Sequence, residues 1–311
     1  MSADHQHHHG HPHGHHHHAP PGGTGKAFAL AVTLNITFVA VEVAAGFVSG
    51  SMALLADAGH NLSDVLSLLL AWAASVLAAR PPCERFTYGL KSSSILAAIA
   101  NAALLLVAVG AILVETIRRV ADPAPVAGAT MMVVAGMGIA INALSALLFA
   151  RGSKSDLNLR AAFVHLMADA AVSAGVVIAG LAILVTGRAL IDPIVSLVIT
   201  GVIAWSSWGL LRDSLRMGML GVPAGIDGAR VRAYLEALPG VARVHDLHIW
   251  PMSTTETALT AHLVMPGGQP GDGFLHDLAH DLDHVFRIGH PTIQIETDAD
   301  TSCALESEAV V

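Results

Sequence analysis

The chain has 311 residues, of which 53% are hydrophobic and only 13% are charged, and its mean hydropathy is +0.60. This composition is too apolar for an ordinary soluble protein of this length and places the chain in a lipid bilayer. The formal net charge of -8 excludes a generally basic nucleic-acid binder, and the two cysteines, Cys83 and Cys303, form neither a CxxC pair nor a disulfide framework.

The N-terminal segment 1–25 is polar and carries ten histidines between His5 and His18. It lacks the basic start, apolar middle and small-residue cleavage site of a signal peptide, so we expect the first apolar stretch to remain as a membrane span. Histidines near pH 7 are mostly neutral and collect zinc weakly, so we interpret 1–25 as a disordered cytoplasmic leader that buffers or delivers metal. An affinity tag is the alternative, and the interspersed glycine and proline residues argue against it.

Six apolar stretches follow, each long enough to cross a bilayer core, which needs about 20 helical residues. Short separators rich in Gly, Pro, Ser or charged residues divide them. The stretches run over residues 27–48, 52–79, 94–114, 128–150, 161–186 and 190–211. The sequence therefore predicts an α-helical integral membrane domain with six transmembrane helices over residues 26–211.

Lysine and arginine residues set the expected orientation, because short loops rich in them stay in the cytoplasm. One side of the predicted bundle has only Arg118, Arg119 and Arg188. The other side collects Lys26, Arg80, Arg85, Lys91, Arg151, Lys154, Arg160, Arg212 and Arg216. We therefore expect a multi-pass membrane protein with an even number of spans and both termini in the cytoplasm, and the Arg118-Arg119 pair is the one dissenting feature.

After residue 211 the sequence takes on ordinary soluble character. Helical spacing or strand alternation marks, in chain order, a helix at 229–238, strands at 244–250 and 257–264, a helix at 274–286 and a strand at 292–296. The order αββαβ permits a three-stranded sheet with both helices on one face, so we predict a cytoplasmic α+β domain over residues 212–298. Residues 299–311 are expected to form a flexible tail.

Two pairs of ionisable residues lie inside the predicted spans at matching spacing. His60 and Asp64 stand four residues apart in the second span, which places both on one helix face. His165 and Asp169 repeat this spacing in the fifth span. Ionisable side chains inside a membrane are costly and mark functional sites by default. Two imidazoles and two carboxylates can complete a tetrahedron around a zinc ion if the two helices are neighbours.

The competing explanation for these pairs is purely structural. In that reading the histidines only bond to their own aspartate or to a backbone carbonyl and tie helices together. Contacts of that kind rarely need two matched carboxylates at mid-membrane. We therefore favour a metal site made of His60, Asp64, His165 and Asp169.

Other polar residues in the spans are less informative. Asp57 lies three residues before His60 and shares roughly its face. It either lines the approach to the site or bonds to a nearby Ser or Asn, and the sequence does not separate these roles. Helix-to-helix hydrogen bonding is favoured over a role in the ion path for Asn35, Asn101 and Asn142.

Motifs around the two pairs resemble those of the cation diffusion facilitator family. The run from Ser49 to Asp64, SGSMALLADAGHNLSD, is similar to the second-span signature of that family. Further similar motifs are RFTYG at 85–89, LNLRAAFVH at 157–165 followed by Asp169, DP at 192–193, LHIW at 247–250 and TIQIE at 292–296. The resemblance covers residues 26–298.

This resemblance implies a homodimeric exporter with six spans per chain and a cytoplasmic domain similar to ferredoxin-like copper chaperones. In that family, histidine at both leading positions goes with zinc and often with cadmium or cobalt, whereas aspartate there accompanies other choices such as manganese and iron. Ligand chemistry agrees independently, because imidazole suits zinc while manganese and magnesium prefer oxygen ligands. The chain lacks the His-rich loop that some zinc exporters carry between the fourth and fifth spans, and we expect the leader to take its place.

The predicted soluble domain carries further candidate ligands. Positions similar to those that bind regulatory metals in family members are held by His245, His262, His290 and Glu296. We expect these four to converge from strands or strand edges into a metal-dependent clamp of the dimer. A stripe of His276, His280 and His284 is equally consistent with a metal site and with an exposed polar face.

These features together predict a zinc/proton antiporter that exports metal from the cytoplasm, with cadmium and cobalt as further substrates. Bound metal requires neutral histidine and ionised aspartate, so protons and zinc compete for the same four ligands. The alternative is a membrane-bound metal sensor in which ion binding acts on the soluble domain without net transport. The sequence has no GxxxxGK[ST] phosphate loop and no Ser-His-Asp or Cys-His arrangement in a supporting context, so we expect no enzyme.

Overall fold

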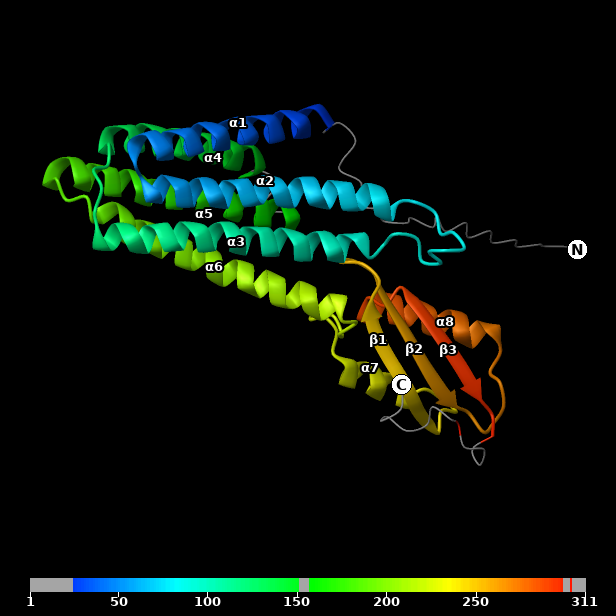
Figure 1. The fold of residues 1–311 in the computed structure, drawn as a ribbon. Coiled ribbons are helices and arrows are strands. Elements are labelled where there is room, and N and C mark those ends of the chain that lie inside the picture. Colours follow the sequence, from blue (N-terminus) through cyan, green and yellow to red (C-terminus); the bar gives the residue numbers. More distant parts are fainter. Residues whose placement is uncertain (1–24, 151–156, 299–302, 304–311) are drawn as a thin grey trace, which may run out of the picture.

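The computed structural model describes residues 25–150, 157–298 and Cys303. Six long helices lie side by side in a bundle, and a small α/β domain sits at one end of it (Figure 1). The long helices are α1 (Gly25–Ser49), α2 (Met52–Ala78), α3 (Ser93–Ala121), α4 (Gly128–Ala150), α5 (Leu157–Thr186) and α6 (Ile191–Gly218). The predicted leader and tail lie outside the described residues, except for Gly25, which begins α1, and Cys303.

Four of these helices, α3, α4, α5 and α6, are long and apolar enough to cross a membrane within the described residues. In α1 the described apolar segment is the shorter Asn35–Ser49. Helix α2 combines its apolar residues with Asp57, His60 and Asp64. A helix therefore occupies each of the six predicted positions, and the assignment of all six as membrane spans stays a prediction.

The interior and exterior of the bundle are both apolar. Small and aliphatic side chains from several helices form the buried core, among them Leu54, Met131 and Val176. Large apolar side chains also point outward, with Val107 73% exposed and Trp205 82% exposed. An outer surface of this kind is suited to lipid and would be unfavourable in water.

Helices α3 and α6 extend past their predicted spans. Helix α3 continues beyond residue 114 to Ala121, and α6 continues beyond residue 211 to Gly218. The added turns carry Arg118 and Arg119 in α3 and Arg216 in α6. The predicted stretches were bounded by apolar character, which marks where a chain leaves the lipid core, whereas arginine has good helix propensity and continues the helix beyond that point.

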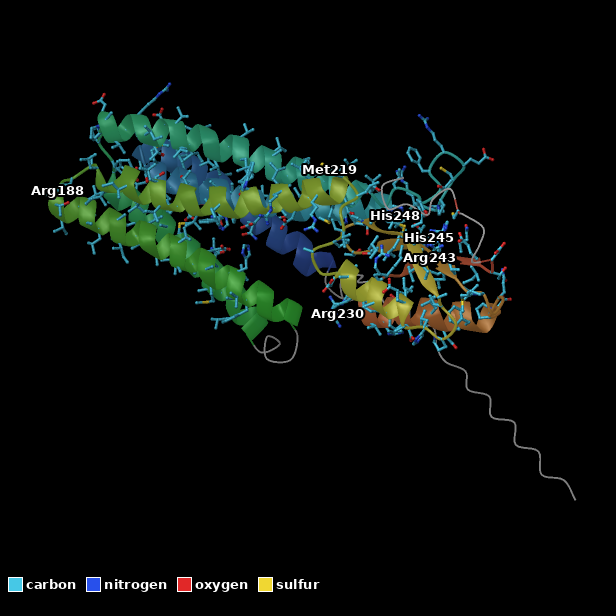
Figure 2. All side chains as sticks on the ribbon, turned by 90° about the horizontal axis from the view of Figure 1, so that it is seen from below. Arg188, Met219, Arg230, Arg243, His245 and His248 are labelled. Atoms are coloured by element: carbon cyan, nitrogen blue, oxygen red, sulfur yellow. The ribbon has the colours of Figure 1, made fainter. Side chains whose placement is uncertain are left out.

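The connections between helices gather at two ends of the bundle. The turns that join α1 to α2, α3 to α4 and α5 to α6 lie at the end remote from the α/β domain (Figure 1). Arg188 lies at this remote end, whereas Met219 and His245 lie at the other (Figure 2). The α2–α3 connection faces the α/β domain, where Lys91 forms an ion pair with Glu256.

A carboxylate from α6 holds the N-terminus of α2. Asp192 Oδ2 accepts a hydrogen bond from the Met52 N–H at 2.6 Å. Asp192 Oδ1 accepts from the Ser51 hydroxyl at 2.5 Å and from the Ala53 N–H at 3.2 Å. The Leu54 N–H donates to Ser51 Oγ at 3.1 Å. Three N–H groups that a helix leaves unpaired at its start are thus satisfied, and the positive end of the helix dipole favours this carboxylate.

The α/β domain follows the predicted order αββαβ. Its elements are α7 (Gly228–Glu236), β1 (Arg243–Pro251), β2 (Thr257–Val264), α8 (Asp272–Phe286) and β3 (His290–Glu296). The sheet order is β1-β2-β3, with β1 antiparallel and β3 parallel to the central β2. Leu235 of α7, Leu263 of β2 and Leu282 of α8 are buried in one core, so both helices cover the same face of the sheet.

An irregularity in β1 changes which side chains reach the other face. The register with β2 shifts between His245 and His248, and Asp246 has a φ of +49°. Aspartate tolerates this left-handed conformation better than most residues. Val244 and Leu247 both contribute to the core despite their spacing of three, because the bulge at Asp246 absorbs one residue.

We predict that Asp192→Asn destabilises the bundle. The substitution removes the charge and places an amide group among three donors, which should cost about 2 kcal/mol or more. The thermal unfolding midpoint of the purified protein in detergent would measure this as a clear decrease. The matched control is Asp213→Asn on the same helix, where an exposed carboxylate pairs only with the neighbouring Arg212. Equal midpoints for the two variants would contradict the capping role.

Candidate metal centres

The two predicted His-Asp pairs meet where α2 and α5 lie side by side. His60 Nε2 lies 3.1 Å from Asp169 Oδ1 and 3.9 Å from Asp64 Oδ2. His165 Nε2 lies 3.4 Å from Asp64 Oδ2 and 3.6 Å from Asp169 Oδ2. The two imidazole rings are edge to face, with centroids 6.1 Å apart. Each imidazole therefore reaches the carboxylate of its own helix and that of the other helix.

These nitrogen–oxygen distances suit a tetrahedral zinc ion. With bonds of about 2.0–2.1 Å to nitrogen and oxygen, the ligand atoms of a tetrahedron stand about 3.3–3.4 Å apart. The two distances that cross between the helices, 3.1 Å from His60 to Asp169 and 3.4 Å from His165 to Asp64, lie near that value. The contacts to Asp169 use different oxygens, Oδ1 for His60 and Oδ2 for His165.

The site is buried on one side and open on the other. The Asp169 side chain is 6% exposed, whereas the His165 side chain is 51% exposed. The ligand atoms of His60, Asp64 and Asp169 all lie within 4.8 Å of one another. His165 is not part of this three-residue group, but its Nε2 lies 3.4 Å from Asp64 Oδ2 on the more exposed side.

Behind the four residues lie two further acidic side chains. Asp57 is fully buried and accepts a hydrogen bond from Ser173 Oγ at 2.9 Å, which matches the bonding role rather than the exposed approach. Glu42 of α1 is also fully buried and accepts from Asn61 Nδ2 at 3.0 Å. Sequence reasoning missed Glu42, although an acidic residue inside an apolar span was a sufficient signal.

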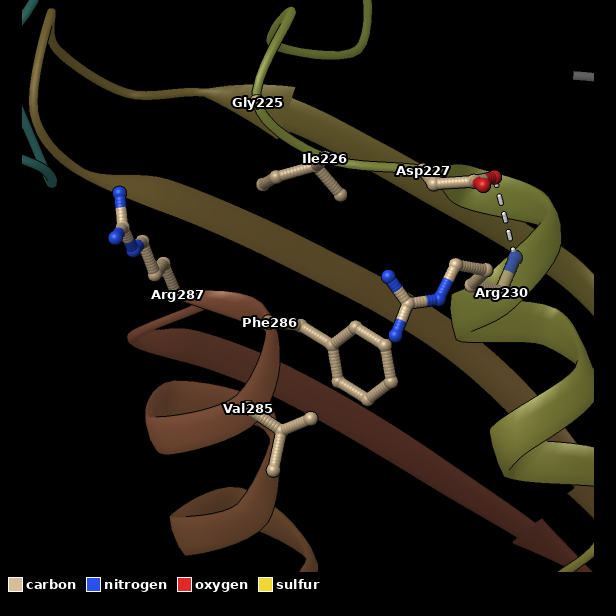
Figure 3. A pocket seen from close by; sticks show the side chains of 7 residues that line it. All are labelled: Gly225, Ile226, Asp227, Arg230, Val285, Phe286 and Arg287. Carbon is tan, nitrogen blue, oxygen red and sulfur yellow. Dashed lines mark hydrogen bonds between the residues drawn. The ribbon is translucent and has the colours of Figure 1, made fainter.

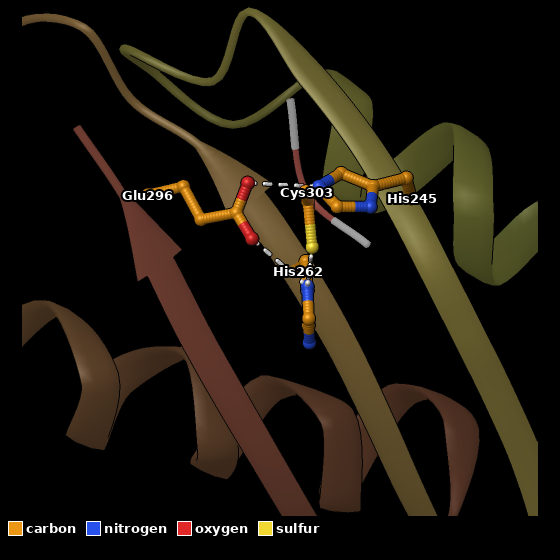
Figure 4. Close-up of side chains that lie close together, drawn as sticks. All are labelled: His245, His262, Glu296 and Cys303. Carbon is orange, nitrogen blue, oxygen red and sulfur yellow. Dashed lines mark hydrogen bonds and ion pairs between the residues drawn. The ribbon is translucent and has the colours of Figure 1, made fainter. Parts of the chain in front are cut away.

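A second cluster lies on the face of the sheet that the helices leave open. It consists of His245 of β1, His262 of β2, Glu296 of β3 and Cys303 (Figure 4). His245 Nε2 lies 2.9 Å from Glu296 Oε2, and His262 Nδ1 lies 3.0 Å from Glu296 Oε1. Cys303 Sγ lies 3.7 Å from His262 Nδ1. Two imidazoles, a carboxylate and a thiol form a set of donors that suits zinc.

The neighbours of Glu296 favour its ionised form. Burial acts to raise the pKa of the Glu296 carboxyl, but hydrogen bonds from His245 and Cys303 hold that pKa below its usual value. The remaining nitrogen of His262, Nε2, lies 3.4 Å from Asp246 Oδ2. A carboxylate on the far side of a ligating imidazole fixes its orientation and tautomer.

The structure changes the predicted membership of this cluster. His290 does not join it, because it lies at the opposite end of β3 from Glu296, and six residues of strand span about 20 Å. Its ring instead contacts the Tyr88 ring, with centroids 5.5 Å apart. Cys303 and Asp246 were missed. Two successive polar residues, His245 and Asp246, before the apolar pattern resumes were a readable sign of the bulge.

Other features of the α/β domain stand apart from both clusters. A pocket between the start of α7 and the end of α8 is lined by Gly225, Ile226, Asp227, Arg230, Val285, Phe286 and Arg287 (Figure 3). It contains none of the predicted ligands. On α8, the rings of His280 and His284 lie 4.2 Å apart, so part of the histidine stripe is in mutual contact.

Two known protein families together match most of the chain. Residues 28–217 match the family described as cation efflux transmembrane domain. Residues 223–298 match the family described as cation efflux protein, cytoplasmic domain. The two matches correspond to the helix bundle and to the α/β domain.

Individual relatives share this similarity over most of their length. The zinc transporter ZitB of Escherichia coli is 39% identical over 86% of this chain and 86% of its own. A cadmium, cobalt and zinc/H(+)-K(+) antiporter of Bacillus subtilis is 33% identical over 88% of this chain and 89% of its own. Among solved structures, the metal-bound C-terminal domain of the CzcD transporter from Cupriavidus metallidurans is 39% identical, covering 23% of this chain and 99% of that one with a TM-score of 0.22.

Proposed function

The chain belongs to the cation efflux family of divalent metal transporters, and on that premise we propose that it exports zinc from the cytoplasm in exchange for protons. Family membership makes it a multi-pass membrane transporter and not an enzyme. Cadmium and cobalt are further proposed substrates, and the named antiporter of Bacillus subtilis supports both.

The observation that carries this proposal is the convergence of two imidazoles and two carboxylates between α2 and α5. Their mutual distances of 3.1 to 3.9 Å fit a tetrahedral ion. Two nitrogen donors favour zinc over manganese or magnesium, which prefer oxygen ligands. We therefore assign His60, Asp64, His165 and Asp169 as the transport site.

Exchange with protons follows from the chemistry of the ligands. Zinc binds neutral imidazole and ionised carboxylate, so loading of the site releases protons and protonation of the site releases zinc. Protons arriving from the outer side would thus displace the ion after the helices reorient. The cycle needs no nucleotide.

The second cluster is proposed as a regulatory zinc site of a homodimer. His245, His262 and Glu296 come from three strands, and Cys303 adds a thiol from beyond the last one. An ion there would tie these segments together and fix the surface that the domain presents to a second copy. Both termini of each chain would lie on the cytoplasmic side of a bacterial cell membrane.

We predict that zinc uptake into proteoliposomes requires the transport site. His60→Ala and Asp169→Ala should reduce the uptake rate by at least the roughly 10–100-fold that disturbing the partners of metal ligands costs. The matched control, His276→Ala, removes an exposed imidazole from α8 and should leave uptake unchanged. Full activity of both site variants would refute the assignment, and binding without uptake by the wild type would favour a sensor.

We also predict that His60→Asp alters ion preference. The change replaces one nitrogen donor by oxygen, so uptake should shift from zinc toward manganese. Competition between the two ions in the same vesicles measures this shift.

A trapped pH dye should report counter-movement of protons with zinc in the wild type, and an unchanged internal pH during transport would exclude antiport.

The regulatory site predicts zinc-dependent protection of Cys303. In a Cys83→Ser background, zinc should slow alkylation of the remaining thiol by about tenfold or more, because a metal-bound thiolate is a poor nucleophile. His262→Ala should abolish the protection. His290→Ala, the matched control outside the cluster, should retain it. Equal alkylation rates with and without zinc in the parent would show that Cys303 is not a ligand.

A further inference from the structure

Two buried carboxyl groups lie beside the transport site without belonging to it. Glu42 of α1 and Asp57 of α2 are each 0% exposed, and they lie within hydrogen-bonding reach of each other. In the described part of the chain, their hydrogen-bond donors are Asn61 and Ser173 rather than any of the four proposed ligands. The pair is therefore a separate titratable group.

Each carboxyl group has one oxygen with a donor and one without. Glu42 Oε2 accepts from Asn61 Nδ2 at 3.0 Å, and Asp57 Oδ2 accepts from Ser173 Oγ at 2.9 Å. Glu42 Oε1 and Asp57 Oδ1 are buried and have no hydrogen-bond partner among the described residues. If one of the two groups is protonated, its O–H can donate a hydrogen bond to the other group, which remains an ionised carboxylate.

No Lys or Arg side chain in the described residues reaches this pair. The charged or titratable groups that act on it from nearby are His60 of α2 and Asp169 of α5. Helix α4, which packs on α1, has no titratable residue. On the other neighbours of α2, Arg119 of α3 binds the Gly50 carbonyl and Asp192 of α6 holds the start of α2.

Two carboxylates that share a water-free site cannot both remain ionised, because their charges repel and neither is solvated. We propose that Glu42 and Asp57 hold one shared proton while the transport site is empty and release it when a divalent cation binds. The oxygens that lack donors, Glu42 Oε1 and Asp57 Oδ1, are the positions available to this proton. The pair is thus a proton-binding site distinct from the metal ligands.

The release step rests on the proposed antiport function and on the position of the pair. Asn61 follows His60 directly in α2, and Ser173 lies one helical turn beyond Asp169 in α5. A bound dication adds two positive charges close to Asp57 in a medium of low dielectric constant. Ionisation of both carboxyl groups offsets the positive charge of the bound cation. The shared proton of Glu42 and Asp57 is therefore lost when the metal binds.

Proton counting in the full-length protein tests the release. Zinc binding would be followed by calorimetry in buffers of different ionisation enthalpy, which yields the protons released per zinc. The double variant Glu42→Gln/Asp57→Asn keeps an N–H donor between the two groups and leaves the four ligands intact. It should bind zinc with less than about a tenfold change in affinity and release about one proton fewer. The exposed pair Glu115→Gln/Asp213→Asn should release as many protons as the wild type.

Infrared spectroscopy tests the shared proton without any transport. The carbonyl stretch of a buried protonated carboxyl group should be present in the zinc-free wild type, decrease on zinc binding, and be absent from the double variant. A wild type without this band would overturn the proposal, as would an unchanged proton count in a double variant that still binds zinc. Failure of zinc to bind or move in the wild type would instead remove the antiport function, and the band would still report on the pair.

Discussion

A carboxylate removed from water must find a hydrogen-bond donor, a cation or a proton, and this constraint organises the helix bundle. Each buried acidic residue meets it in a different way. Asp192 receives donors from the N-terminus of α2. Asp169, with the partly exposed Asp64 beside it, faces two imidazoles. Glu42 and Asp57 face each other. The same unfavourable burial therefore underlies the structural clamp at Asp192, the cluster that we propose as the transport site and the carboxyl pair that we propose as a proton-binding site.

Helix α2 takes part in every one of these solutions. Its start is fixed by α6, its middle carries Asp57, His60 and Asp64, and its far end leads into the connection that contacts the α/β domain. Helix α5 completes the metal site from the side with Asp169 and His165. A movement of α2 relative to α5 would change the two distances that cross between the helices, His60 to Asp169 and His165 to Asp64, and leave the distance within each helix unchanged.

Much of this arrangement could be predicted from local spacing, because a helix fixes which side chains share a face. The i, i+4 spacing of His60 and Asp64 predicted that both side chains share one helix face. The order αββαβ predicted a sheet with one face covered by helices and the other open. The predicted last strand began at residue 292, so the sequence pattern did not place His290 at the far end of the same strand as Glu296. Glu42 was missed because the apolar residues around it dominate the mean hydropathy of that stretch. Cys303 was missed because it lies beyond the last helix or strand, where no sequence periodicity places a side chain. Whether these residues meet depends on tertiary packing, which no local pattern encodes.

The clamp between α6 and α2 has a consequence for the order of assembly. Asp192 and Met52 are separated by 140 residues, yet they share a hydrogen bond. During synthesis, α2 is made long before α6, and loop closure over such a distance is slow. Until then the first turn of α2 must keep its backbone donors near water or near another partner. Packing of α6 thus supplies the hydrogen-bond acceptors that the first turn of α2 needs. The face of α2 that carries His60 and Asp64 therefore reaches its final position only when the whole bundle is present.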